Sequence, residues 1–376
     1  MHGYIHGRRT VILVGVVTAL LCGLRGGQAS ELNGYAQPSL NGAIVRPHLE
    51  TPASPAPPQI HLPSASAARL LTSQDLVVPS HVRLMVFAPH PDDETLAAGG
   101  LIQRVLTAGG EVRVVFVTNG DGYVDGVRRE IQRVHTSTTD FIQYGERRHE
   151  EALQALAHLG VAVTNGLFLG FPDDGIDDLW AGHWSTLKPY TSPYTRFDRP
   201  AYKESLSRQV EYAGTDLENE IARTLRDFQP DWVLLPDPRD RHPDHCTTGV
   251  FVLDALRQLR TVAGSRFAHT QALTYLVHYP DYPASQTWVR EIAGAGVGGS
   301  STAGHALAAA RWLNLPLAPG ELARKREAMG EYRSQVLVMQ PFLRQFLVSS
   351  ELFGQLDAAQ VEAVPHEYAL RFRRRQ

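Results

Sequence analysis

Short apolar runs alternate along the chain with longer segments in which apolar residues recur every three or four positions. The runs predict buried strands at residues 82–88, 112–117, 167–169, 232–235 and 273–277. The spaced apolar residues predict helices around Leu101, around Leu156 and from about Thr247 to Arg260. Because helices and strands alternate, we expect an α/β fold, with a Rossmann-like, mostly parallel sheet flanked by helices in a three-layer sandwich.

The first eighty residues lack this rhythm. A 14-residue apolar run, Val11–Leu24, follows two arginines and precedes a stretch of small residues. A spanning helix needs roughly 20 apolar residues, so residues 1–30 are predicted to be a signal peptide and no stable membrane span is expected. Residues 31–80, rich in Pro, Ala and Ser, predict a disordered linker. The folded domain is expected at residues 81–376.

The leader predicts an exported protein, periplasmic or extracellular. Two variants stay open, because Arg8 and Arg9 weakly resemble a twin-arginine signal and Cys22 offers a lipidation site for membrane anchoring. Cleavage of the leader would leave Cys246 as the single cysteine, so no internal disulfide is expected. Cys246 is expected in the core rather than on a metal.

Composition excludes one class of partner. The hydrophobic fraction of 43% is ample for a large core. The formal charge of -3 leaves no basic surplus to neutralise phosphates, so nucleic acid is not an expected partner. Composition does not indicate the oligomeric state.

The candidate catalytic and metal-binding residues lie directly after the first predicted strand, in Pro89–Glu94 (PHPDDE). Ligand crevices of open α/β sheets lie at the carboxyl ends of strands. His90 and Asp93 are three residues apart in a turn with two prolines, which favours an imidazole and a carboxylate directed at one point. Zinc binds such ligands. The alternatives are a simple turn and helix cap, with Glu94 complementing the helix dipole.

A second turn strengthens the zinc hypothesis. Arg241–His245 (RHPDH) also follows an apolar strand and precedes a helix, so both turns lie at the same edge of one sheet. A catalytic zinc takes three protein ligands and leaves a position for water. His90, Asp93 and one residue of the second turn complete that count, which predicts one zinc per chain. Asp244 is also suited to capping the following helix.

Together, the PHPDDE and HPDH segments resemble the PIG-L/LmbE family of zinc-dependent N-deacetylases. Weaker features agree in order: Arg148-x-x-Glu151, Phe171-Pro172-Asp173 and Lys325-x-x-Ala328-x-x-x-Tyr332-x-Ser334-Gln335. The resemblance covers about His81 to Phe353. It implies an LmbE-like fold in which zinc is bound by three residues, His90, Asp93 and His245.

The resemblance also implies catalytic roles. Asp92 would be the general base that takes a proton from water activated by zinc. Protonated His242 would stabilise the oxyanion, with Asp244 orienting its ring and favouring its cationic form.

The family acts largely on N-acetylglucosamine units joined to different aglycones. The resemblance therefore implies hydrolysis of an acetamide on an amino sugar, with Asp173 contacting a sugar hydroxyl and Arg148 as a second substrate or structural anchor. Arg148 and Glu151 are equally suited to an ion pair on one helix. An aromatic-rich stretch between Phe171 and Glu218 fits a sugar platform and an insertion packed on the core equally well.

Two other hypotheses stay open. One is a secreted carbohydrate-binding protein on a deacetylase scaffold, which keeps zinc without turnover. Asp92 and His242 disfavour it, because binding alone does not require them. The other is a zinc hydrolase of an ester or a non-sugar amide. The sequence does not indicate the aglycone, acyl groups beyond acetyl or the physiological metal.

Overall fold

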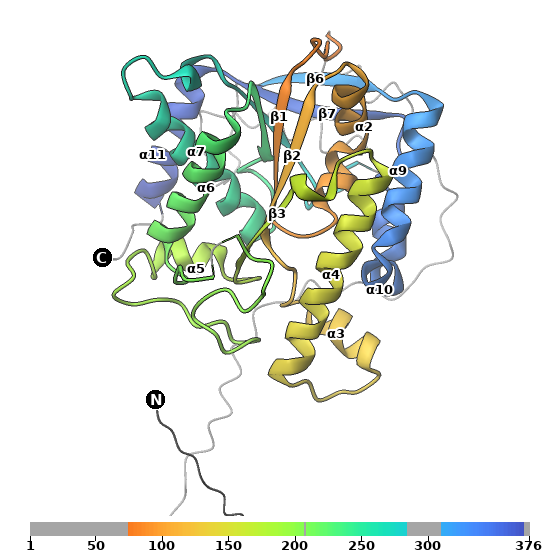
Figure 1. Cartoon of the computed structure of the whole chain (residues 1–376), viewed down its shortest axis with the longest axis vertical. Coiled ribbons are helices and arrows are strands. Elements are labelled where there is room, and N and C mark those ends of the chain that lie inside the picture. Colours follow the sequence, from red (N-terminus) through yellow and green to blue (C-terminus); the bar gives the residue numbers. More distant parts are fainter. Residues whose placement is uncertain (1–73, 207, 284–309, 372–376) are drawn as a thin grey trace, which may run out of the picture. The chain divides into compact units, whose positions relative to one another are not determined.

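The computed structural model describes residues 74–206, 208–283 and 310–371, which form a seven-stranded sheet with helices on both faces (Figure 1). The strands are β1 Arg83–Ala88, β2 Glu111–Thr118, β3 Gly166–Phe171, β4 Trp232–Pro236, β5 Gln271–Tyr275, β6 Arg311–Pro316 and β7 Ser350–Leu356. Their order is β3-β2-β1-β4-β5-β7-β6. The first five in that order pair in parallel, whereas β7 is antiparallel to β5 and β6. The predicted fold class is confirmed.

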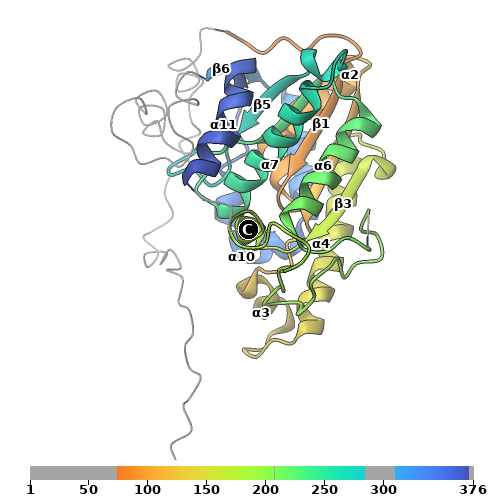
Figure 2. The same ribbon diagram turned by 90° about the vertical axis from the view of Figure 1, so that its left-hand side faces the viewer.

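The helices form two layers, one on each face of the sheet (Figures 1 and 2). One layer holds α2 Asp93–Thr107, α4 Thr138–His158, α9 Pro319–Glu331 and α10 Arg333–Arg344, with α3 Val124–Ile131 beside α4 and α10. The other holds α5 Ile176–Ala181, α6 Gly214–Phe228, α7 Pro243–Arg260 and α11 Ala358–Arg371. Two short 3-10 helices, η1 Val163–Asn165 and η2 Arg266–His269, connect elements.

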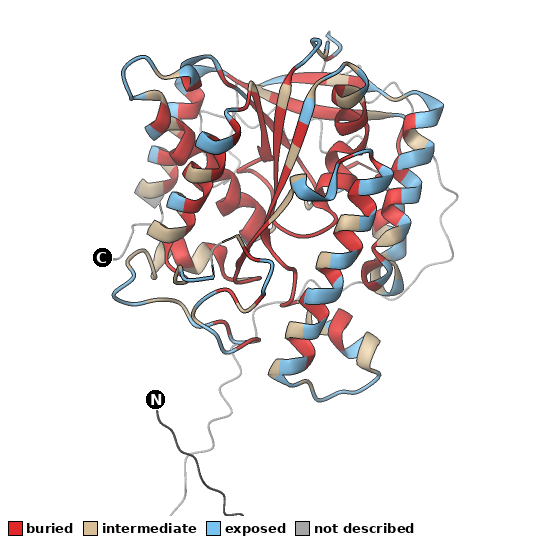
Figure 3. Cartoon of the chain, in the orientation of Figure 1, coloured by how far each residue is buried: buried red, intermediate tan, exposed pale blue. Residues whose placement is uncertain are grey.

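The central strands are buried on both faces, as Figure 3 shows. In β1, Leu84 and Val86 belong to the core under α2 and α9, while Met85 and Phe87 belong to the core under α6 and α7. Side chains of a strand alternate between faces, so a strand covered twice must be apolar throughout. This requirement explains the continuous apolar runs in the sequence.

The folded part begins earlier than the predicted boundary at His81. The Leu76 N–H donates to the Asn314 carbonyl of β6 at 2.7 Å, and the Leu76 side chain is buried. The predicted signal peptide and most of the predicted linker lie outside the described residues. Within the described part, no helix combines the length and apolarity needed to cross a membrane.

The order of the strands determines where a ligand can bind. From β1 the chain continues to β2 and β3 on one side, and it later returns to β4 and β5 on the other side. Neighbouring connections therefore diverge between β1 and β4, and the carboxyl ends of such strands are where open α/β sheets bind ligands. The segment Pro89–Asp92 follows β1 and the segment Asp237–His242 follows β4. The fold thus brings the two predicted turns together.

Candidate metal centre and active site

The turn between β1 and α2 contains a strained residue. Asp92 is the N-cap of α2, with φ 136° and ψ -28°, a conformation that non-glycine residues rarely adopt. Its side chain makes no capping hydrogen bond, so the simple helix-cap alternative is wrong for Asp92. The carboxylate of Asp92 is therefore free of a capping role. A backbone conformation of this kind costs about 1–3 kcal/mol, and residues that adopt it cluster at functional sites.

Three ligand atoms converge beside this turn. Oδ2 of Asp93 lies 3.4 Å from Nδ1 of His90 and 3.2 Å from Nε2 of His245, and the two nitrogens lie 3.3 Å apart. All three side chains are buried. A tetrahedral zinc with ligands at about 2.0–2.1 Å separates them by about 3.3–3.4 Å. The structure thus brings the three predicted ligands together at the spacing that one zinc requires.

The charges around the ligands also suit a cation. Burial by itself lowers the pKa of an imidazole, yet Asp173 raises the pKa of His90 well above its usual value. Against the same effect of burial, Asp93 and Asp240 raise the pKa of His245 to about 9. The carboxylates therefore favour positive charge at this point. A divalent cation supplies it, and its ligands lose their protons on binding.

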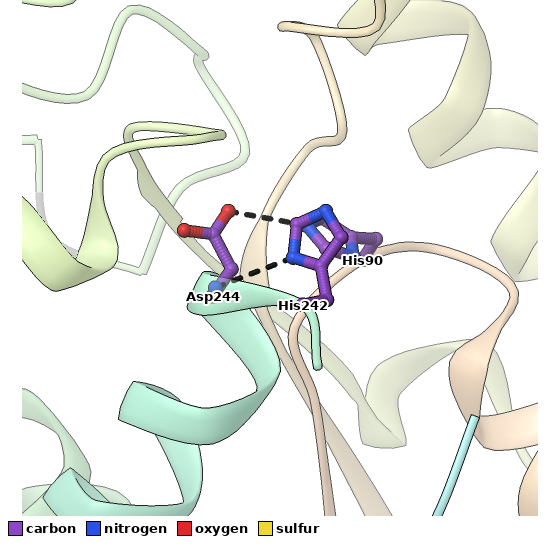
Figure 4. Close-up of side chains that lie close together, drawn as sticks. All are labelled: His90, His242 and Asp244. Carbon is purple, nitrogen blue, oxygen red and sulfur yellow. Dashed lines mark hydrogen bonds and ion pairs between the residues drawn. The ribbon is translucent and has the colours of Figure 1, made fainter. Parts of the chain in front are cut away.

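A second group with metal-binding geometry shares one residue with the first and consists of His90, His242 and Asp244 (Figure 4). Both oxygens of its carboxylate and one nitrogen of His242 already accept backbone N–H groups. Oδ2 of Asp244 accepts the Asp174 N–H at 2.7 Å, and Oδ1 accepts the Ile176 N–H at 3.0 Å. Nδ1 of His242 accepts the Asp244 N–H at 3.2 Å. In the first group, Oδ2 of Asp93 accepts one backbone N–H, that of His90 at 2.8 Å. The group with Asp93 and His245 thus has fewer such contacts and is the better candidate for the metal.

The carboxylate of Asp244 faces His90 and not His242, which corrects the predicted orienting contact (Figure 4). Asp244 lies in the first turn of α7, where its backbone reaches the His242 ring and its side chain extends the other way. Its Oδ2 lies 3.2 Å from Nε2 of His90, and Oδ1 of Asp173 lies 3.1 Å from the same nitrogen. Two carboxylates thus hold the far nitrogen of His90 and leave Nδ1 for a metal.

Asp173 is engaged on both oxygens, because its Oδ2 accepts the Gly122 N–H at 2.6 Å. Its predicted contact with a sugar hydroxyl stays a prediction. The structure gives it a different observable partner, the His90 ring.

His242 is the N-cap of α7, and its Nδ1 accepts a backbone N–H. A ring nitrogen that accepts carries no proton, so this contact favours the neutral ring with its proton on Nε2. Burial lowers the pKa of His242 to about 4, and His90 acts in the same direction, whereas Asp244 raises this pKa as predicted but by less. The structure therefore does not support the predicted cationic form. A neutral ring can still donate a hydrogen bond from Nε2.

Arg148 anchors the backbone of two loops. Its Nη1 donates to the Gly120 carbonyl at 2.9 Å, and its Nη2 donates to the Pro91 carbonyl at 2.6 Å. Nη2 also lies 3.4 Å from Oδ2 of Asp92. Burial raises the pKa of Asp92 to about 8, against the pull of Arg148. Arg148 thus supports the turn that carries the predicted base.

Two residues of the C-terminal motif, Tyr332 and Ser334, donate hydrogen bonds to buried carboxylates of other elements. Glu94 is buried and accepts hydrogen bonds from the Tyr332 hydroxyl and from the Asp92 N–H, so it does more than complement a helix dipole. Glu151 accepts from the N–H and the hydroxyl of Ser334 at 2.9 and 2.6 Å. The alternative of an ion pair along α4 is therefore wrong.

Two further residues of the site, Asp240 and His278, are not predicted from the sequence. Oδ2 of Asp240 lies 3.6 Å from Nδ1 of His245. The ring of His278, just beyond β5, lies 4.7 Å from the His245 ring and 5.1 Å from the His242 ring. His278 follows a parallel strand, so the rule that places ligands at carboxyl ends could have found it. Asp240 lies two residues before the HPDH segment, with no periodic signal of its own.

The aromatic stretch mainly packs on the core. Trp180 is 0% exposed and Tyr202 is 1% exposed, and the Trp180 ring lies 5.0 Å from the Phe251 ring of α7. Packing therefore explains these two residues, and a sugar platform does not. Cys246 is buried as expected, and its thiol donates to the Pro238 carbonyl at 3.0 Å.

A family model described as "PIG-L: GlcNAc-PI de-N-acetylase" matches residues 85–256, which include both turns and all three candidate ligands. The chain belongs to the PIG-L/LmbE family. The match agrees with the resemblance in the PHPDDE and HPDH segments. It also covers Arg148 and Asp173.

Two relatives are described as 1D-myo-inositol 2-acetamido-2-deoxy-alpha-D-glucopyranoside deacetylase. The protein from Mycobacterium sp. (strain KMS) is 34% identical over 169 residues, 44% of this chain and 47% of that protein. The protein from Saccharomonospora viridis is 30% identical over 198 residues, 50% of this chain and 65% of that protein. This family member thus spans between about half and two thirds of their length.

Among solved structures, the chain is similar to N,N'-diacetylchitobiose deacetylase from Pyrococcus horikoshii. The identity is 19%, the TM-score is 0.42, and the likeness covers 73% of this chain and 83% of that one.

Proposed function

We propose that this member of the PIG-L/LmbE family is a zinc-dependent deacetylase. It hydrolyses the acetamide of an N-acetylglucosamine-type amino sugar in a glycan, oligosaccharide or glycoconjugate, and it releases acetate and a free amine. The observation that carries the proposal is the buried triangle of His90, Asp93 and His245 with the carboxylate of Asp92 on the adjacent residue. The names of the relatives support the class of sugar.

Zinc held by the three ligands would supply Lewis acidity toward the acyl oxygen and toward water. The chain supplies the proton transfers. A cation bound beside Asp92 would lower its raised pKa, so that the carboxylate is ionised and can act as a base. Asp92 takes the proton of the attacking water and passes it to the leaving nitrogen, so the amine departs neutral. Arg148 holds Asp92 from the side through Nη2. This contact fixes the carboxylate in position for both transfers.

His242 stabilises the developing oxyanion as a neutral donor. Its Nδ1 is occupied by the Asp244 N–H, which leaves Nε2–H as the free donor of the ring. A preorganised neutral donor contributes to the rate, because it is in place before charge develops.

The same proposal includes export. The predicted signal peptide at residues 1–30 supports it, and a periplasmic or extracellular glycan or glycosylated metabolite is then the expected substrate. Cell fractionation with N-terminal sequencing of the mature chain tests this part. A full-length chain in the cytoplasmic fraction would contradict it.

The test of the activity uses the purified protein, loaded with zinc, on a panel of N-acetylated glycosides. Acetate and primary amine are measured together, so that transfer of the acetyl group to another acceptor is recognised. We expect both products in equal amounts, and we expect Asp92→Asn to lose about 10²- to 10⁴-fold in rate, the usual contribution of a general base. The control is Asp125→Asn, an exposed carboxylate on α3.

The panel also separates the two alternatives. Glycan binding without release of either product would support a carbohydrate-binding protein. Faster turnover of acyl esters or non-sugar amides would support another zinc hydrolase. Removal of zinc with a chelator should abolish turnover, and readdition should restore it.

A further inference from the structure

Asp240 lies in the segment between β4 and α7 and is 4% exposed. Its Oδ1 accepts the His242 N–H at 3.0 Å. Its Oδ2 accepts the Val277 N–H at 2.9 Å and the His278 N–H at 3.0 Å. One carboxylate therefore joins the loop before α7 to the loop after β5.

The same Oδ2 faces the far side of a candidate metal ligand. Nε2 of His245 is one of the three candidate ligand atoms, which His90, Asp93 and His245 contribute and which we call the ligand triangle. Nδ1 of His245 is buried and makes no hydrogen bond to any described residue. Oδ2 of Asp240 lies 3.6 Å from this Nδ1, which is longer than a hydrogen bond but close enough for a strong charge interaction. A histidine that binds a metal through Nε2 carries its proton on Nδ1, and such protons almost always face a carboxylate, carbonyl or water.

We propose that Asp240 is a positioning residue, whose carboxylate holds the His245 ring in the orientation that binds zinc and so sets the metal affinity of the site. The inference rests on the proposed zinc site. It concerns a residue outside the three ligands and outside the proton transfers of the proposed mechanism.

The geometry requires a carboxylate at this position. Both oxygens act only as acceptors, toward the His242 N–H on one side and toward two backbone N–H groups and His245 on the other. An asparagine has one acceptor oxygen, so its amide group must face donors on one of the two sides. Asp240→Asn therefore removes the charge beside His245 and breaks one set of contacts, with almost no change in volume.

Asp237 supplies a matched control. It lies in the same segment and is 0% exposed. Its oxygens accept from the Arg239 guanidinium at 2.9 and 2.8 Å and from the Thr274 hydroxyl at 2.8 Å. Asp237→Asn thus disturbs an equally buried carboxylate, but one whose contacts lead away from His245.

The experiment measures zinc affinity directly, by competition between metal-free protein and a chromophoric chelator. We expect Asp240→Asn to bind zinc about 10- to 100-fold more weakly than the parent, the usual effect of losing such an outer partner. Asp237→Asn should keep the parental affinity, although its thermal stability falls. Circular dichroism of the metal-free proteins checks that both variants are folded.

A spectroscopic measurement reports the geometry of the metal site, which a general loss of stability does not change. In the cobalt-substituted protein, Asp240→Asn should change the visible absorption bands that report ligand geometry, and Asp237→Asn should leave them unchanged. Equal effects of the two substitutions on affinity and spectrum would overturn the proposal, as would parental affinity in Asp240→Asn.

If Asp240→Asn does not fold, the test passes to Asp240→Glu, which keeps both acceptors but displaces them by one methylene. Zinc affinity below that of the parent supports the proposal, and unchanged affinity overturns it. Failure of the zinc site itself gives a different result, because His245→Ala would then retain parental zinc affinity.

Discussion

The two His/Asp turns are alike in sequence but differ in what their carboxylates do. In the turn after β1, Asp93 lies in the ligand triangle and Asp92 is left beside it in a strained conformation. In the segment after β4, Asp240 and Asp244 face the far sides of the histidines. The first turn therefore supplies two ligands, His90 and Asp93, and the predicted base, while the second supplies one ligand, His245, and the supports.

The difference follows from the backbone. The first turn enters α2 directly from the strand, so it has few residues with which to place a support. The second segment runs from Asp237 to His242 before α7 begins, and it folds back on the loop after β5 through Asp240. Similar motifs thus have different roles because the connections that carry them differ in length.

The largest effect is expected when a histidine of the second turn is replaced. His245→Ala should lose stoichiometric zinc, because a ligand of the triangle is gone, and turnover should fall to background. His242→Ala should keep its zinc and lose about 10²- to 10³-fold in rate, the usual cost of one oxyanion donor. Metal analysis of dialysed protein and steady-state kinetics measure both. If His242→Ala loses zinc and His245→Ala keeps it, the metal is bound by the second group, His90, His242 and Asp244.

Much of this site could be predicted from sequence, for physical reasons. Doubly covered strands must be apolar, and parallel strands place their carboxyl ends together, so β1, β4 and the two turns were found. The two antiparallel strands at one end of the sheet, β7 and the edge strand β6, are not predicted from the sequence. β7 carries Glu351 within the strand and pairs it with buried Lys325. A paired buried charge breaks the apolar pattern on which the prediction depends.

The contacts of individual side chains could not be predicted. Nothing in the spacing of the HPDH segment shows that Asp244 turns toward His90 and not toward His242. That direction depends on the backbone N–H groups of Asp174 and Ile176, which come from a distant loop. Similarly, Asp240 gains its partners only when the loop after β5 folds against it.

A smaller effect is expected where the first turn receives its support. Arg148→Lys keeps the charge but cannot reproduce the two hydrogen bonds to the Gly120 and Pro91 carbonyls together with the contact to Asp92. We expect kcat to fall about 10- to 100-fold through misplacement of the base, with KM nearly unchanged. The control is Arg147→Lys, an exposed neighbour on α4. A rise in KM with unchanged kcat would instead support the predicted substrate contact.

The two histidine ligands, His90 and His245, should also differ in how much zinc affinity is lost when one supporting carboxylate is replaced. His90 faces both Asp173 and Asp244, whereas His245 faces Asp240. Asp173→Asn should therefore weaken zinc binding less than Asp240→Asn does, by under about tenfold. The chelator competition assay compares the two variants directly. A larger loss in Asp173→Asn would contradict the difference between the turns, and a higher KM at parental zinc affinity would favour the sugar contact.

The smallest effect is expected at Cys246, which adjoins a ligand without being one. Its thiol is buried and donates to the Pro238 carbonyl, away from the ligand triangle. Cys246→Ala removes a sulfur atom and a weak hydrogen bond, so we expect a loss of about 1 kcal/mol in stability. For a domain of this size the corresponding drop in Tm is about 2–4 °C. Zinc content and kcat should stay at the parental level, because no ligand or proton donor has changed. Loss of zinc in this variant would add the thiol to the metal site, and the second turn would then supply two ligands where the structure assigns one.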